Sequence, residues 1–132
     1  MKLEKINYKD LKPKAQEIFN FQKVSATLAD YGFTTMWLNN DWLGGDFLAV
    51  HIDGKTFLKV QLKGRLSFNR GYRGKDIYIC FICDGETYLY PHDLILDQIE
   101  SKISDKTYLN KGTWSCRKLT QEYRQLLEPY LL

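Results

Sequence analysis

The stretch from residue 46 to residue 63, DFLAVHIDGKTFLKVQLK, carries the strongest fold signal in the sequence. Two runs within it, residues 47–52 and 56–63, are rich in β-branched, aromatic and aliphatic side chains, a composition typical of strands. Asp53-Gly54, which stands between the two runs, is a favoured two-residue hairpin turn. The stretch therefore predicts an antiparallel hairpin in which the residues flanking this turn pair with each other.

The predicted hairpin places three polar side chains together at its end far from the turn. Asp46 is expected directly opposite Gln61, and opposed residues have Cβ atoms roughly 4.5–5.5 Å apart. Lys63 lies two residues beyond Gln61, so both side chains project from the same face of the strand. A carboxylate, an amide oxygen and an ammonium group thus share one small patch. The alternative is a polar hairpin end with a solvated Asp–Lys pair, which stabilises little.

The patch has the chemistry of a divalent-metal site. Mg²⁺ prefers oxygen ligands, and Asp46 offers an anionic one. Gln61 can add its side-chain carbonyl oxygen, and the backbone carbonyl of Leu62 is a third candidate. Lys63 beside a metal can hold or deprotonate an attacking water, or stabilise the charge that builds on phosphorus.

The rest of the chain reads as further helices and strands. Pro13 suits a first helical turn and Gly32 a helix stop, so a helix is expected over residues 10–31. Further strands are predicted over residues 33–38, 76–83 and 87–90, and further helices over residues 93–103 and 120–131. The order α-β-β-β-β-β-α-α indicates one α/β (α+β) domain, residues 1–132, with a mixed central β-sheet flanked by helices.

Composition and charge exclude few classes of protein. The chain has 132 residues, of which 44% are hydrophobic and 27% charged, as is ordinary for a soluble domain. Its net charge of +3 permits a polyanionic partner without arguing for one. No run approaches the ~18 apolar residues of a membrane span, and the N-terminal residues are polar. We therefore expect a cytoplasmic protein with no membrane partner.

Cys80 and Cys83 form a C-x-x-C within the apolar run IYICFIC. Such a pair can belong to a zinc knuckle or a redox site. Residues three apart in a strand point to opposite faces, however, and no second ligand pair follows. We interpret both as buried structural thiols, in agreement with the odd number of cysteines.

The hairpin end resembles the core motif of the PD-(D/E)xK nuclease superfamily. The carrying residues are DWLGGDF at 41–47 and, fifteen residues after Asp46, the run Gln61-Leu62-Lys63. The later run YLYPHDL at 88–94 is similar to a strand-to-helix turn of small members. The superfamily includes restriction endonucleases, Holliday junction resolvases and small homing endonucleases. The resemblance implies a restriction-endonuclease-like fold.

The resemblance also assigns roles to residues. It implies that Asp46 binds the metal and that Lys63 is the catalytic lysine. Gln61 stands where most members have Glu or Asp. A Q-x-K variant occurs in the superfamily, and it removes one negative charge, which should weaken metal binding. Asp41 is an alternative metal ligand, although a turn-forming aspartate explains it equally well.

Many members carry an acidic residue on the first helix, and here Glu17 is the candidate. Gln22 lies nearer the usual distance from the glycine after that helix, and an ordinary solvated helix face is the alternative for Glu17. The segment after the hairpin is basic and aromatic, and a flexible loop there could contact the DNA backbone. Its basic residues are Arg65, Arg70, Arg73 and Lys75, and an ordinary solvated loop is again the alternative.

Three functional hypotheses follow. The first is a DNA endonuclease that hydrolyses phosphodiester bonds with Mg²⁺ or Mn²⁺; because duplex cutting usually needs two sites, it implies a homodimer or higher homo-oligomer. The second is a catalytically silent DNA-binding or assembly module of the same fold. The third is a small-molecule or protein-binding domain unrelated to nucleic acid, which would show no salt-dependent DNA affinity.

Overall fold

The computed structural model describes residues 1–40 and 44–132. Its helices and strands follow in the order α1 (Pro13–Ala29), β1 (Phe33–Trp37), β2 (Phe47–His51), β3 (Phe57–Lys63), β4 (Leu66–Asn69), β5 (Ile77–Cys83), β6 (Glu86–Pro91), α2 (His92–Ile99), α3 (Lys106–Lys111), β7 (Thr113–Cys116) and α4 (Gln121–Leu127). Short 3-10 turns precede α1 and follow β4, α2 and α4.

The main sheet has five strands in the order β1-β2-β3-β5-β6. The β1–β2, β2–β3 and β5–β6 pairs are antiparallel, whereas β3 and β5 run parallel, so the sheet is mixed. In sequence, β4 lies between the two parallel strands β3 and β5. In space, β4 pairs with β7 in a separate two-stranded sheet. The predicted mixed sheet flanked by helices is thereby confirmed.

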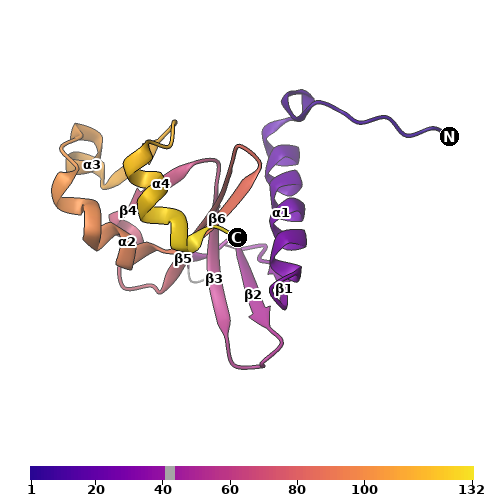
Figure 1. Ribbon diagram of the computed structural model, residues 1–132, viewed down its shortest axis with the longest axis horizontal. Helices are drawn as coiled ribbons and strands as arrows, with labels where there is room; N and C mark the ends of the chain where they lie inside the picture. The colour runs from indigo at the N-terminus through magenta and orange to yellow at the C-terminus, as the bar shows by residue number, and fades with distance from the viewer. Residues whose placement is uncertain (41–43) are drawn as a thin grey trace.

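Helices lie on both sides of the main sheet, with α1 on one side and α2, α3 and α4 on the other (Figure 1). Under α1, a buried cluster joins Val24 and Leu28 to Phe47, Val60 and Cys80 of the sheet. A second cluster on the other face joins β5 and β6 to the remaining helices and the small sheet; its fully buried members include Ile79, Tyr90, Ile95, Leu96 and Leu127.

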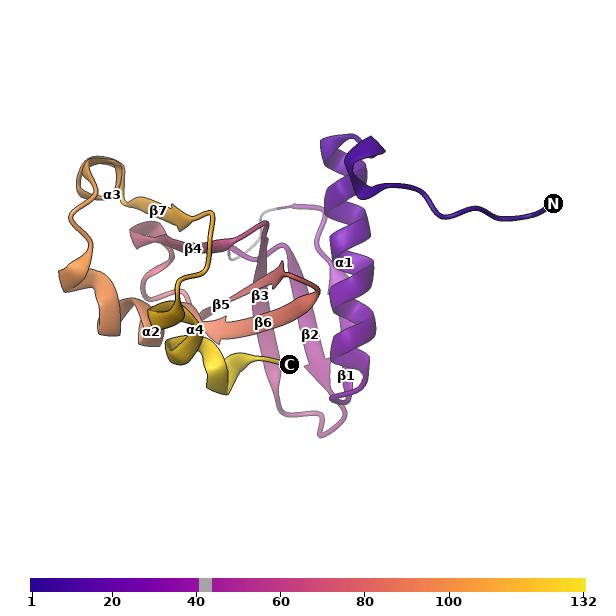
Figure 2. The ribbon, with the colours of Figure 1, turned by 45° about the horizontal axis from the view of Figure 1, so that its top comes forward.

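Alternation along β3 separates the two faces at the place where the predicted site lies. Leu58, Val60 and Leu62 pack in the cluster under α1. Gln61 and Lys63 alternate with them and therefore project from the opposite face. The strand ends at Lys63, and the chain then turns into β4, which runs beside β7 above the main sheet (Figure 2).

The hairpin register is confirmed, but its turn is longer than predicted. Phe47 pairs with Val60 and Val50 with Phe57, as the sequence predicts. The backbone N–H of His51 donates to the carbonyl of Thr56 at 2.9 Å, so the loop contains residues 52–55 instead of two residues. Asp53 stabilises this loop, because its carboxylate accepts hydrogen bonds from the Thr56 hydroxyl and from two backbone N–H groups. These bonds lower the pKa of Asp53.

Three elements escaped prediction: β4, β7 and α3. The segment expected to be a flexible basic loop instead contains β4 and a 3-10 turn at Arg70–Tyr72, because apolar Leu66 and Phe68 of β4 are buried in the second cluster. The two predicted C-terminal helices are also shorter than expected, since each ends in a 3-10 turn. Within the described residues, no helix combines the length and apolar character needed to cross a membrane.

Candidate active site

Asp46 lies immediately before β2, with its carboxylate against the end of β3. Its backbone N–H donates to the carbonyl of Val60 at 2.8 Å, which attaches it to the ladder just before the first pair of β2 with β3. Its side-chain Oδ2 accepts the backbone N–H of Leu62 at 2.8 Å. The half-buried carboxylate is therefore held one residue away from both Gln61 and Lys63 along the strand.

The backbone of Leu62 faces the same edge of β3 as this carboxylate. A residue in a strand presents its N–H and C=O to one edge, since paired antiparallel residues exchange both hydrogen bonds. Because the N–H of Leu62 reaches Asp46, its carbonyl oxygen also faces the Asp46 side. Asp46 and the Leu62 carbonyl can thus offer two oxygens to one cation.

Gln61 contributes a buried oxygen without a hydrogen-bond donor. Its amide Nε2 donates to the Tyr72 hydroxyl at 3.2 Å, while Oε1 is buried and has no hydrogen-bond partner among the described residues. A buried side-chain carbonyl is normally satisfied, because leaving it bare costs about 1–3 kcal/mol. Such an oxygen can coordinate a hard cation instead, so the oxygens of Asp46, Leu62 and Gln61 fit a magnesium or manganese ion.

Lys63 lies where several hollows meet. Its ammonium group stands 5.5 Å from the centroid of the Tyr72 ring. Lys63 lines a hollow of about 320 Å³ beneath β4, β7 and the start of α3, and two more, of about 530 and 190 Å³, beside α1. Lys63 therefore contributes to hollows on both sides of the end of β3.

Glu17 shares one of these hollows with Lys63 but comes from the other side of the sheet. The hollow of about 190 Å³ is lined by Glu17 of α1 together with Leu62 and Lys63. Glu17 also makes an exposed ion pair with Lys14 at 3.5 Å. Within residues 1–40 and 44–132, no group of three or more His, Cys, Asp or Glu side chains is placed to hold a metal. Asp41, the alternative ligand, lies outside the described residues.

A layer of aromatic side chains supports Gln61 and Lys63 from below. Tyr72 lies in the 3-10 turn after β4, and its ring meets the ring of His92 edge-on, with centroids 5.4 Å apart. His92 is fully buried; its Nε2 accepts the N–H of Asn69 at 3.1 Å, so Nδ1 carries the proton and donates to Asp93 at 2.7 Å. Burial lowers the pKa of His92, which keeps the ring neutral. Sequence reasoning did not assign Tyr72 a role, since this contact has no local signature.

The predicted DNA-binding residues divide into two kinds. Arg73 binds Asp97 at 2.7 Å and Glu100 at 2.9 Å, and these hydrogen bonds raise its pKa. Arg70 stacks over the Tyr108 ring at 5.1 Å and donates to a carbonyl of α3. Both therefore fasten the segment after β3 to the helices. The other two basic residues, Arg65 and Lys75, are exposed, as are Arg70 and Arg73, so what separates the two kinds is the contacts with the helices and not the exposure.

The C-x-x-C pair lies on opposite faces of β5, as predicted. Cys80 is buried in the cluster under α1, whereas Cys83 is half-buried against the second cluster. Burial raises the pKa of the Cys80 thiol to about 12. The two thiols cannot bind one metal or pair with each other from opposite faces.

Comparison with known proteins gives a partial likeness to a solved structure. No family model matches the sequence, and no curated protein matches it. Among solved structures, the chain is similar to a bacterial homing endonuclease, I-Ssp6803I, with 20% sequence identity and a TM-score of 0.47. The likeness covers 64% of this chain and 69% of that one.

Proposed function

We propose that this chain is a metal-dependent DNA endonuclease that hydrolyses phosphodiester bonds at the end of β3. The observation that supports this most is the buried Oε1 of Gln61, which has no hydrogen-bond partner among the described residues. Gln61 directly precedes Leu62, whose N–H holds the Asp46 carboxylate, and Lys63, which lines open hollows. An oxygen with no donor in the described part of the chain, at a strand end that also carries the Asp46 contact and Lys63, suits a cation and a phosphate.

Asp46, Gln61 and the Leu62 carbonyl would hold Mg²⁺ or Mn²⁺. When bound, the ion supplies a positive charge that polarises the phosphate and acidifies water. Asp46 provides the negative charge, and the Leu62 N–H fixes the orientation of its carboxylate. With one carboxylate and two neutral oxygens, the site matches the preference of Mg²⁺ for few protein ligands with the rest from water and phosphate.

Lys63 acts on the water or the phosphate. Its Nζ can donate a hydrogen bond to an oxygen of the attacked phosphate, where charge develops, or accept the proton of the attacking water when neutral. The Tyr72 ring below it limits where the ammonium can move. Glu17, which lines one of the same hollows from the α1 side of the sheet, is a further acidic group that we propose for the site.

DNA would bind across the exposed end of β3. Arg65 and Lys75 are exposed and can contact backbone phosphates, whereas Arg70 and Arg73 keep the segment in place. Cutting both strands of a duplex requires two sites, so we propose a homodimer or a higher homo-oligomer.

The second candidate is a DNA-binding module of the same fold without catalytic activity. It is favoured by Gln61, which leaves Asp46 as the only carboxylate among these three ligand residues, and by the lack of a larger acidic cluster among the described residues. A site with a single negative charge binds divalent ions weakly.

Cleavage of plasmid and branched DNA tests the proposal, with Mg²⁺ or Mn²⁺ against chelator. We expect metal-dependent cutting by the parent chain and a loss of cutting in Lys63→Ala. The matched control is Lys59→Ala, because Lys59 lies on the same face of the same strand. Cutting by Lys63→Ala at the rate of the control would overturn the assignment of Lys63.

The same assay separates the two candidates. Salt-dependent DNA binding without any cutting by the parent, together with activity gained in Gln61→Glu, would identify the non-catalytic module. A chain that neither cuts nor binds DNA would contradict both candidates and favour the small-molecule or protein-binding hypothesis.

A further inference from the structure

We propose that Tyr72 is the positioning residue that allows a glutamine to act as a metal ligand in this site. The inference rests on the proposed function. A glutamate at position 61 would need no orienting partner, because its two carboxylate oxygens are equivalent. A glutamine presents oxygen at one end of its amide and nitrogen at the other, so an N–H turned toward a cation would repel it.

The Tyr72 hydroxyl selects the productive orientation of this amide. It accepts a hydrogen bond from Nε2 of Gln61 at 3.2 Å, and the opposite atom, Oε1, is the buried oxygen for which residues 1–40 and 44–132 supply no hydrogen-bond partner. With Nε2 held by the hydroxyl, the oxygen is left for the cation. The hydroxyl therefore acts on metal binding through Gln61, without touching the metal itself.

The Tyr72 ring positions the Lys63 ammonium, as the Tyr72 hydroxyl positions the Gln61 amide. The Lys63 ammonium stands 5.5 Å from the ring centroid, within the range of a cation–π contact. One side chain thus places both the ligand amide and the ammonium. The two contacts use different parts of Tyr72, the hydroxyl and the ring, so substitutions can separate them.

Tyr72 is in turn held by a buried, neutral imidazole. His92 meets the Tyr72 ring edge-on at 74°, and its two ring nitrogens are taken by the N–H of Asn69 and by Asp93. This leaves the imidazole with no nitrogen to offer the Tyr72 hydroxyl. Tyr72 and Lys63 also line the same hollow of about 320 Å³.

A double-mutant cycle between residues 72 and 61 tests the proposal. The probe is Mn²⁺ alone, titrated by calorimetry into the full-length protein. We expect Tyr72→Phe, which keeps the ring, to weaken Mn²⁺ binding about threefold to tenfold, the value of one net hydrogen bond. In the Gln61→Glu background the same substitution should change Mn²⁺ affinity less than about twofold, because a carboxylate needs no orientation.

Two controls exclude a merely structural effect. Tyr78→Phe removes a hydroxyl from a half-buried tyrosine under α1 and should leave Mn²⁺ affinity unchanged. The melting temperature of Tyr72→Phe should stay close to that of Tyr78→Phe. Tyr72→Leu removes the ring as well, so it should lower the cleavage rate at saturating metal more than Tyr72→Phe does.

The outcomes distinguish this inference from the proposed function. If the parent binds Mn²⁺ and Tyr72→Phe binds it equally well, or if both backgrounds weaken equally, Tyr72 does not orient the amide and the inference fails alone. If the parent neither binds Mn²⁺ nor cleaves DNA, the proposed function fails and the inference fails with it.

Discussion

Replacing Asp46 by asparagine or by alanine separates the two roles that the structure gives to its carboxylate. The carboxylate accepts the Leu62 N–H at 2.8 Å, and we propose that it also binds the metal. Asparagine keeps an acceptor oxygen and removes the negative charge. Alanine removes both. The two variants should therefore differ in stability and agree in their loss of metal binding.

The magnitude follows from the hydrogen bond. A bond to a charged acceptor contributes about 1.5–3 kcal/mol when fully buried, and Asp46 is half-buried, so alanine should cost about 1–2 kcal/mol. Asparagine retains a neutral bond and should cost less than about 1 kcal/mol. For a domain of this size each kcal/mol corresponds to roughly 3–5 °C in melting temperature. Alanine should thus melt several degrees below asparagine.

Thermal melting, Mn²⁺ titration and plasmid cleavage measure the three quantities on the same samples. Asp30→Asn, at the exposed end of α1, is the control for removing a negative charge elsewhere. Metal-dependent cleavage by Asp46→Asn at the rate of the parent would refute the reasoning about the ligand. Equal melting temperatures for the alanine and asparagine variants would refute the reasoning about the Leu62 contact.

Three further predictions concern other parts of the chain. Burial puts the pKa of His92 below its unfolded value of 6.5, so the unfolded chain takes up this proton first as the pH falls. The free energy of unfolding should therefore be full above about pH 6.5 and decline below it, by at most about 1.4 kcal/mol per pH unit. Urea unfolding midpoints measured against pH should decline less steeply in His92→Gln than in the parent. In filter binding, Arg65→Ala should reduce the slope of log affinity against log salt concentration by about one counterion. Arg73→Ala should leave this slope unchanged and should cost about 1 kcal/mol of stability in thermal melting, because it removes the ion pair with Asp97. Burial raises the pKa of Cys80 to about 12, so alkylation of the native protein should leave this thiol unlabelled while the two half-buried cysteines react, as mass spectrometry would show. Labelling of Cys80 at the rate of the other two would contradict its burial.

The hairpin could be predicted because its information is local. Alternating apolar residues and the Asp53-Gly54 turn determine the register, and the register brings Asp46 to the end of β3. The length of the loop could not be predicted in the same way. It depends on Asp53 accepting hydrogen bonds from Lys55 and Thr56, which favours four loop residues over two.

The second sheet and the supporting layer depend on contacts between distant residues. β4 and β7 are four residues long, and each becomes a strand only by pairing with the other. The helix α3 carried local signals, an Asp105 cap and a left-handed Gly112, but it is too short and polar to show a hydrophobic periodicity. The ion pairs of Arg73 could not be predicted, because its acidic partners on and after α2 are remote in sequence.

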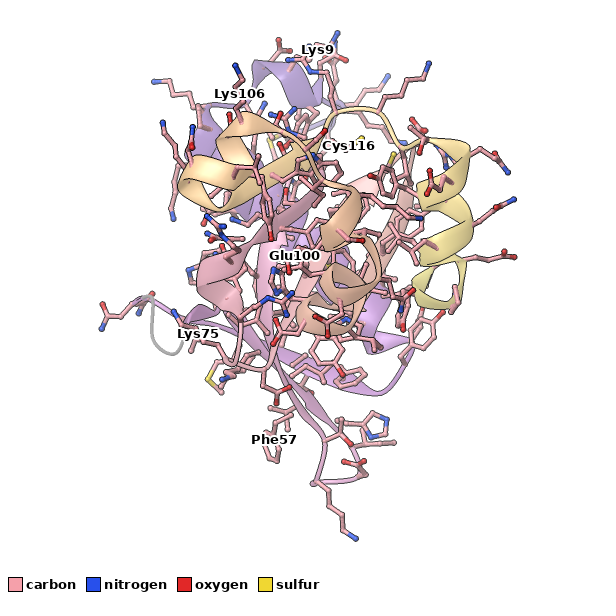
Figure 3. The ribbon with its side chains drawn as sticks, turned by 90° about the vertical axis from the view of Figure 1, so that its left-hand side faces the viewer. Lys9, Phe57, Lys75, Glu100, Lys106 and Cys116 are labelled. Carbon is pink, nitrogen blue, oxygen red and sulfur yellow. The ribbon has the colours of Figure 1, made fainter. Side chains whose placement is uncertain are left out.

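The unequal covering of the main sheet has a consequence for how the protein fluctuates. β5 and β6 have a buried cluster on each face, whereas β1 and β2 pack on α1 with one face and leave Leu48 and Val50 half-buried on the other. Met36 of β1 and Phe57 of β3 are 56% and 58% exposed, and Phe57 lies near the free end of the hairpin (Figure 3). Amide hydrogens of β1 and β2 should therefore exchange through local opening while those of β5 exchange only on global unfolding. Asp46 lies immediately before β2, which should open first, and Lys63 lies at the end of β3, beside the strands that should stay closed. A ligand that bridges Asp46 and Lys63 should therefore slow amide hydrogen exchange more in β2 than in any other strand of the sheet.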